Sequence, residues 1–241
     1  MTMLAVAQIS KFSRLRRAPG FTLTVVAILA LGVGANTAIF SLFDSLLLRP
    51  LPVRDPQHLL LLRWHAPEFP RFRVGFSMPE ACAVEQTKAG ESSCSFSYPL
   101  YGQLRDSGLF AGLAGFTGEE RFTLSGVGLA RASRGRYVSG NYFQVLGLRA
   151  ELGRLLGPGD DQAGASAVVI SDRFWRDSLN GEPGVIGRTI VINGQACTIV
   201  GVAEAGFTSL VPGDREDLWL PLAVRARVAP AGAPEGDGFA F

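Results

Sequence analysis

The sequence has few of the residues on which most enzymes and metal sites depend. Its 241 residues include only 2 histidines and 3 cysteines. The histidines, His58 and His65, have no cysteine near them in sequence, whereas a zinc site needs three or four ligands. The sequence also has no Walker A loop, no H-E-x-x-H and no G-x-S-x-G motif. We therefore expect no metal, no cofactor and no enzyme, although a catalytic site assembled from distant residues would also lack such motifs.

A large excess of charge of one sign is also missing. The formal net charge is +2, and no basic stripe follows the N-terminal run of Lys11, Arg14, Arg16 and Arg17. Membrane topology explains this run better than phosphate binding does, so we expect no nucleic acid partner. The acidic pair Asp160-Asp161 could hold a cation, but an acidic turn is the more common use of such residues.

One long uncharged stretch is present, from Phe21 to Phe43, directly behind the basic run. A helix of this length reaches roughly 35 Å, enough to cross a hydrocarbon core of about 30 Å with some tilt. A secretory signal peptide and a buried soluble helix are the alternatives. The apolar character continues beyond the small residues Ala35–Ala38, whereas signal peptides have apolar regions of only ~7–15 residues. We interpret the stretch as a transmembrane helix.

This predicted helix carries small and hydroxyl residues on one side and larger ones, such as Ile28 and Ile39, on the other. In lipid, small residues let helix backbones approach each other closely, so the stripe predicts a neighbouring membrane helix. The alternative is chance, because alanine and glycine are frequent in this chain, which has 29 glycines. The predicted packing stripe consists of Ala30, Gly34, Thr37, Ala38 and Ser41.

The positive charges before the helix outnumber those that follow it closely, Arg49 and Arg54. This bias predicts that the N-terminus is cytoplasmic and that the part of the chain after the helix lies on the opposite side of the membrane. The compartment outside permits disulfides. We predict that Cys82 and Cys94, which share one irregular stretch, can form a disulfide, and that Cys197 stays reduced in the core.

Short strands and helices alternate behind the span, which predicts an α+β fold: one N-terminal transmembrane helix followed by a mixed α/β domain with hairpins and short helices. Residues 68–97 are predicted to be rich in loops. Asn193-Gly194 meets the positive-φ demand of a type I′ turn and predicts a hairpin, with Ile190, Ile192, Cys197 and Ile199 on one face. The predicted strands are 59–64, which we expect to be buried, 113–116, 121–124, 131–138, 167–170, 188–192, 195–202 and 217–222, and the predicted helices are 98–105, 142–146 and 172–179.

Several segments resemble, in order, the MacB/FtsX-like ABC transporter permease family, in particular its periplasmic core domain. Each segment alone is a weak signal, but the series is specific. Residues 4–17 can form a short amphipathic helix that lies in the membrane interface and ends before Pro19-Gly20. With the periplasmic core domain that the resemblance implies, we expect four parts: a cytoplasmic amphipathic juxtamembrane segment at 1–20, a transmembrane helix at 21–48, a periplasmic core domain at 49–228 and a Pro/Gly/Ala-rich tail at 229–241. The resembling segments are 15–52, 138–161, 168–179, 184–207 and 217–222.

The family resemblance implies a permease subunit in the bacterial inner membrane that pairs with a cytoplasmic ABC ATPase and forms a homodimer or pseudo-dimer through its membrane helices. Its periplasmic domain would move with ATP turnover. The family places three further spans after this domain, and the chain ends at Phe241 before them, so we expect the N-terminal fragment of a permease. The alternatives are a single-pass anchored periplasmic binding or adaptor module and an anchored enzyme.

Overall fold

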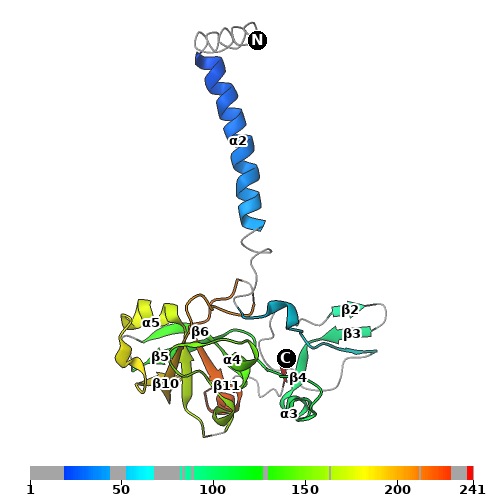
Figure 1. The fold of residues 1–241 in the computed structure, drawn as a ribbon, viewed down its shortest axis with the longest axis vertical. Helices are drawn as coiled ribbons and strands as arrows, with labels where there is room; N and C mark the ends of the chain where they lie inside the picture. The colour runs from blue at the N-terminus through cyan, green and yellow to red at the C-terminus, as the bar shows by residue number, and fades with distance from the viewer. Residues whose placement is uncertain are drawn as a thin grey trace, which may run out of the picture. The chain divides into compact units, whose positions relative to one another are not determined.

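The computed structural model describes residues 19–43, 53–67, 82, 85–87, 90–126, 130–162, 164–211, 213–228 and 238–240. The chain forms two compact units, Met1–Arg49 and Pro50–Phe241, and Figure 1 shows the elements of each. The amphipathic segment predicted at 4–17 and most of the predicted tail lie outside the described residues.

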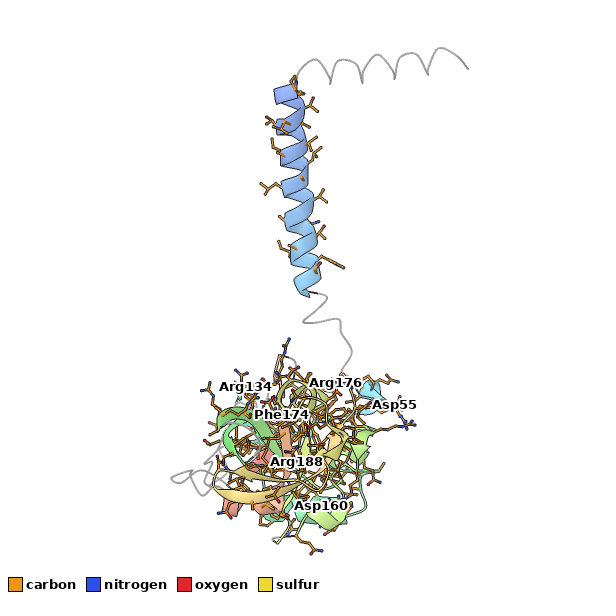
Figure 2. All side chains as sticks on the ribbon, turned by 90° about the vertical axis from the view of Figure 1, so that its left-hand side faces the viewer. Asp55, Arg134, Asp160, Phe174, Arg176 and Arg188 are labelled. Carbon is orange, nitrogen blue, oxygen red and sulfur yellow. A yellow bond between two sulfur atoms is a disulfide. The ribbon has the colours of Figure 1, made fainter. Side chains whose placement is uncertain are left out.

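The first unit contains the helix α2 (Pro19–Phe43). It is long and apolar enough to cross a membrane, and its side chains project on all sides of the ribbon (Figure 2). The helix begins at Pro19, ahead of the predicted start at residue 21. Proline is tolerated in the first turn of a helix because its missing N–H would have no intrahelical partner there. Residues 44–48 of the predicted span lie outside the described residues.

The second unit is built around a seven-stranded sheet in the spatial order β7-β10-β8-β11-β6-β5-β9. Strand β9 also pairs with β10, which closes β10, β8, β11, β6, β5 and β9 into a ring. Such closure pairs strand edges that would otherwise be open to other chains. The pairs β8–β10 and β6–β11 are parallel. The strands are β5 (Glu120–Ser125), β6 (Arg131–Val138), β7 (Ala150–Gly153), β8 (Ala167–Ile170), β9 (Thr189–Ile192), β10 (Gln195–Ala203) and β11 (Leu218–Pro221).

The turn between β9 and β10 sets the register of both strands. Asn193 and Gly194 have φ angles of 49° and 83°, the left-handed conformation that a type I′ turn requires. The Asn193 side chain also accepts a hydrogen bond from the amide of Thr123 on β5 at 2.8 Å, which ties the turn to the opposite strand. Four side chains of this pair lie in the core, each at most 1% exposed: Ile190, Ile192, Cys197 and Ile199.

Helix α5 (Asp172–Leu179) covers one face of the large sheet. The Ser171 hydroxyl caps it by accepting a hydrogen bond from the Phe174 amide at 3.1 Å, and Asn180 ends it in the left-handed conformation. Phe174 and Trp175 are buried against the sheet. The remaining helical elements are η2 (Pro56–His58), α3 (Tyr98–Asp106), α4 (Tyr142–Val145), η4 (Pro158–Asp160), η5 (Pro183–Val185), η6 (Leu222–Val224) and α6 (Arg225–Val228).

Strand β8 is buried on both faces and so divides the core into two clusters. Val168 and Ile170 belong to the cluster that contains Phe174, whereas Val169 belongs to the cluster that contains Trp219 of β11. A strand buried on both faces carries a continuous apolar run without alternation. This is why residues 167–170 could be recognised as a strand from sequence.

The predicted buried strand at 59–64 is wrong. The strand β1 covers only Trp64–Ala66, and Leu60 is 91% exposed. Four consecutive leucines do not show which of them face the core. Of the described residues 53–67, only Trp64–Ala66 pairs with a described strand, β3 (Gly90–Ser93). Residues 68–97, predicted to be rich in loops, contain this strand as well as β2 (Glu85–Thr87) and β4 (Ser95–Ser97).

The predicted strand at 113–116 is also absent. Phe116 forms an isolated bridge to Val138, but the Ser139 hydroxyl accepts the hydrogen bond of the Gly115 amide at 2.9 Å. A side chain thus takes the place of a strand carbonyl, and no ladder forms. The described C-terminal strand, β12 (Gly238–Ala240), pairs antiparallel with β4.

Candidate functional site

The predicted packing stripe lies on α2 and is exposed along its length. Ala30, Gly34, Thr37, Ala38 and Ser41 are all exposed, and a Cβ built on Gly34 would meet no atom within 4 Å. The Thr37 hydroxyl donates to the Val33 carbonyl at 2.8 Å, so it needs no partner from another helix. The stripe is therefore an exposed surface of small side chains. The Thr37 hydroxyl on it already has its hydrogen-bond acceptor within the helix.

The two cysteines predicted to pair are joined in the structure. Cys82 and Cys94 form a disulfide with a Cα–Cα distance of 4.9 Å, and both are buried. The Ser93 hydroxyl donates to the Cys82 carbonyl at 2.7 Å, which adds a second link between the same two segments. Cys197 is a free thiol buried in the core.

A buried arginine joins three parts of the second unit. The side chain of Arg136 on β6 donates to Oε1 of Glu216 at 2.6 Å, to Oδ2 of Asp214 at 3.0 Å and to the Thr117 carbonyl at 2.7 Å. Glu216 also accepts from Nε1 of Trp219 at 2.9 Å. Burial raises the pKa of Glu216 above its usual value, and the positive charge of Arg136 opposes this effect. The cluster fastens β6 to the segment that leads into β11.

The acidic pair that could have held a cation is used by the fold. Asp160 accepts two hydrogen bonds from the Arg154 guanidinium, at 2.6 and 3.0 Å. Asp161 accepts from the Gly140 amide at 2.9 Å. Across the described ranges, no group of three or more histidine, cysteine or acidic side chains is arranged to hold a metal ion.

Four arginines from four segments surround a hollow of about 420 Å³ where the β6–β11 pairing ends. We call it the arginine hollow and define it by Arg121, Arg134, Arg173 and Arg215 with Ala132, Ser133 and Asp217. These residues come from segments that are far apart in sequence, so no motif spacing identifies them. Arg136 could not be identified from the sequence for the same reason, since its partners are also distant in the chain. The only local signal is the density of arginine in the segment of β6, RASRGRYV.

Comparison with known proteins decides the family. A family model described as the MacB-like periplasmic core domain matches residues 22–236. The chain belongs to this family. The match includes most of α2 and nearly all of the second unit, so the helix and the sheet domain occur in the family together.

Individual relatives are more distant. The macrolide export ATP-binding/permease proteins MacB of Neisseria gonorrhoeae and Neisseria meningitidis serogroup B are each 33% identical over 84 residues, which is 35% of this chain but only 13% of theirs. Among solved structures, the periplasmic region of MacB from Actinobacillus actinomycetemcomitans is 17% identical, with a TM-score of 0.48 over 60% of this chain and 64% of that chain. The extracellular domain of the noncanonic ABC-type transporter YknZ is 19% identical, with a TM-score of 0.45 over 62% and 72%.

The MacB-like family is a component of transporter permeases rather than a classical enzyme. A MacB-like periplasmic domain behind one long apolar helix fits an inner-membrane protein with a domain in the periplasm.

Proposed function

We propose that this chain is the N-terminal part of a permease subunit of an ABC-type transport or mechanotransmission system, in which a cytoplasmic ATPase moves the external domain. One observation carries the proposal: the family match extends from residue 22 to residue 236 and so joins an apolar helix to a sheet domain in one chain. The chain has no phosphate-binding loop of its own, so its energy has to come from a partner.

In this proposal, the basic run keeps the N-terminus in the cytoplasm and residues 49–228 form the periplasmic domain. The membrane segment is 21–48, with the amphipathic segment 1–20 before it and the tail 229–241 after the domain. The stripe around Gly34 packs against a second membrane helix, from another copy of this chain or from a related subunit, with lipid around both. Small residues are what such close packing requires.

Movement can be transmitted only by an external domain that moves as a body. Two links would keep the domain rigid. The disulfide joins Cys82 to Cys94 in an irregular stretch, and the Arg136–Glu216 pair joins residues that are 80 positions apart in sequence. A partner then changes the balance between two discrete arrangements of the subunit, which is how a packed protein transmits a local event.

The test is purification of the full chain, tagged and in mild detergent, from membranes of the bacterium that encodes it. We expect an ATP-hydrolysing subunit with a Walker A loop to co-purify. Adding ATP should then change the labelling rate of a cysteine introduced at Leu60, which is 91% exposed, whereas ADP should not. If no ATPase co-purifies and nucleotide changes nothing, the anchored binding or adaptor module becomes the better interpretation.

A further inference from the structure

The arginine hollow lies where two strands stop pairing. The parallel ladder between β6 and β11 begins at Gly135 and Leu218, so residues 131–134 of β6 extend beyond it. Asp217 fills part of the gap: its amide donates to the Arg134 carbonyl at 2.7 Å, and its Oδ2 accepts from the Arg134 amide at 3.3 Å. Beyond Asp217, this edge of β6 is open to the hollow.

The charge in the hollow is not balanced. Its lining contains four guanidinium groups and the single carboxylate of Asp217, which pairs with Arg173 at 2.6 Å. Arg134 reaches Glu119 only at 3.6 Å, and 54% of its side chain stays exposed. Among the residues that the structure describes, neither Arg121 nor Arg215 has an ion-pair partner. Positive charge therefore remains without a counter-ion from the fold.

Two of these arginines face each other directly. Arg121 on β5 and Arg134 on β6 are cross-strand partners, which places their side chains on the same face of the sheet. Like charges in this position repel each other and destabilise the pair. An anion between the two guanidinium groups would turn this repulsion into attraction.

The backbone of β6 adds a further donor. Thr123, the cross-strand partner of Ala132, exchanges its own backbone hydrogen bonds with Asn193 instead of with Ala132. In an antiparallel ladder, Ala132 then directs its N–H and C=O away from β5, toward the side on which it lines the hollow.

We propose that the arginine hollow binds a phosphate group. Guanidinium forks match the oxygens of phosphate, and a tetrahedral anion can engage several forks as well as the Ala132 amide, whereas a carboxylate offers only two oxygens. The phosphate is carried by a free solute or by the headgroup of a lipid. This inference does not rest on the proposed permease function.

The experiment uses the full chain in a nonionic detergent without phosphate. Thermal unfolding is followed by tryptophan fluorescence during titration with inorganic phosphate, and in a second series with a short-chain phosphatidic acid, at constant ionic strength set by chloride. Binding to the folded state raises the unfolding temperature with ligand concentration. A rise in both series assigns the site to phosphate itself, and a rise with phosphatidic acid alone assigns it to a lipid headgroup.

Variants locate the effect. Arg121→Gln and Arg215→Gln should each weaken the apparent affinity roughly tenfold or more, because each removes a charge-assisted hydrogen bond. Arg149→Gln, which removes an exposed positive charge outside the hollow, should leave it unchanged.

If neither ligand raises the unfolding temperature above the chloride control, the proposal is wrong. It is equally wrong if Arg149→Gln reduces the effect as much as Arg121→Gln does, because attraction to the overall positive charge would then explain the binding.

Discussion

Arg136 donates from Nε to Oε1 of Glu216 across 2.6 Å, and neither side chain is exposed to solvent. The pair joins β6 to the segment before β11, and Asp214, Thr117 and Trp219 satisfy the remaining polar groups. A buried ion pair stabilises a fold only while both partners are present. Removal of one leaves a charge without water or a counter-ion.

Arg136→Met should therefore destabilise the external domain by about 3–5 kcal/mol, because Glu216 would stay buried without its partner. The double variant Arg136→Met/Glu216→Leu should recover part of this loss. The measurement is urea unfolding of the full chain in detergent, followed by tryptophan fluorescence.

The matched control is Arg188→Met, which breaks an exposed ion pair with Glu182 at 3.0 Å. Its cost should stay below about 1 kcal/mol, as is typical of surface ion pairs. Equal losses in Arg136→Met and Arg188→Met would contradict the structural role given to the buried pair.

The disulfide gives a second prediction. Peptides of the unreduced protein should contain Cys82 linked to Cys94, whereas Cys197 should react with a thiol reagent only after unfolding, because it is buried in the core. Cys82→Ser should cost on the order of 2–3 kcal/mol by the loop-entropy argument. Detection of both thiols free in protein from the periplasm would rule out the disulfide.

Elements with local signals could be predicted from the sequence. The Asn193-Gly194 turn depends on two adjacent residues, and strands β9 and β10 and helix α5 lie within a residue of their predicted bounds. Strands at 59–64 and 113–116 were predicted wrongly because a strand also needs a partner. The Ser139 hydroxyl, which replaces such a partner at Gly115, is 24 residues away in sequence.

Charged clusters could not be predicted for the same reason. Asp214 and Glu216 lie 78 and 80 residues from Arg136, so no motif spacing links them. The arginine hollow likewise draws on β5, β6, α5 and the segment before β11. By contrast, the stripe on α2 was visible because a helix brings residues three and four apart onto one face.

The ion pair of Arg154 and Asp160 predicts a dependence on pH. Burial alone would raise the pKa of Asp160, but hydrogen bonds from Arg154 and Gly157 hold it below the ordinary value of 3.8. A carboxylate with a lowered pKa stabilises the fold above its unfolded pKa, and this stabilisation is lost as the pH falls through the folded value. Asp160→Asn should thus be less stable than wild type at pH 7, with a gap that closes at acidic pH. Asp177→Asn, an exposed control, should show no such gap.

Topology is testable at Leu60, which is 91% exposed in the external domain. A Leu60→Cys variant should react with a membrane-impermeant maleimide in cells with an intact inner membrane, because the basic run before Phe21 keeps the N-terminus inside. A Thr2→Cys variant should react only after lysis. The reverse pattern of labelling would overturn the predicted orientation.

The last prediction concerns α2 itself. Gly34 and Gly32 lie on one helix, and a Cβ on either would meet no atom within 4 Å in this chain. Because residues two apart lie about 200° apart around a helix, Gly34 belongs to the packing stripe and Gly32 faces the other way. Leucine at either site is compatible with a helix in lipid, but only leucine at 34 would keep a neighbouring backbone at a distance.

Gly34→Leu should therefore abolish activity in a complementation assay with the full-length protein, whereas Gly32→Leu should retain it. Both variants should keep the wild-type unfolding temperature of the external domain, because neither glycine belongs to that unit. A protein that uses α2 only as an anchor would tolerate both changes equally, since lipid accommodates leucine on any face. Wild-type activity and assembly of Gly34→Leu would thus remove the packing role from the stripe and favour the anchored module. Loss of activity in both variants would instead indicate that α2 tolerates no enlargement, and the two faces could not be assigned different roles.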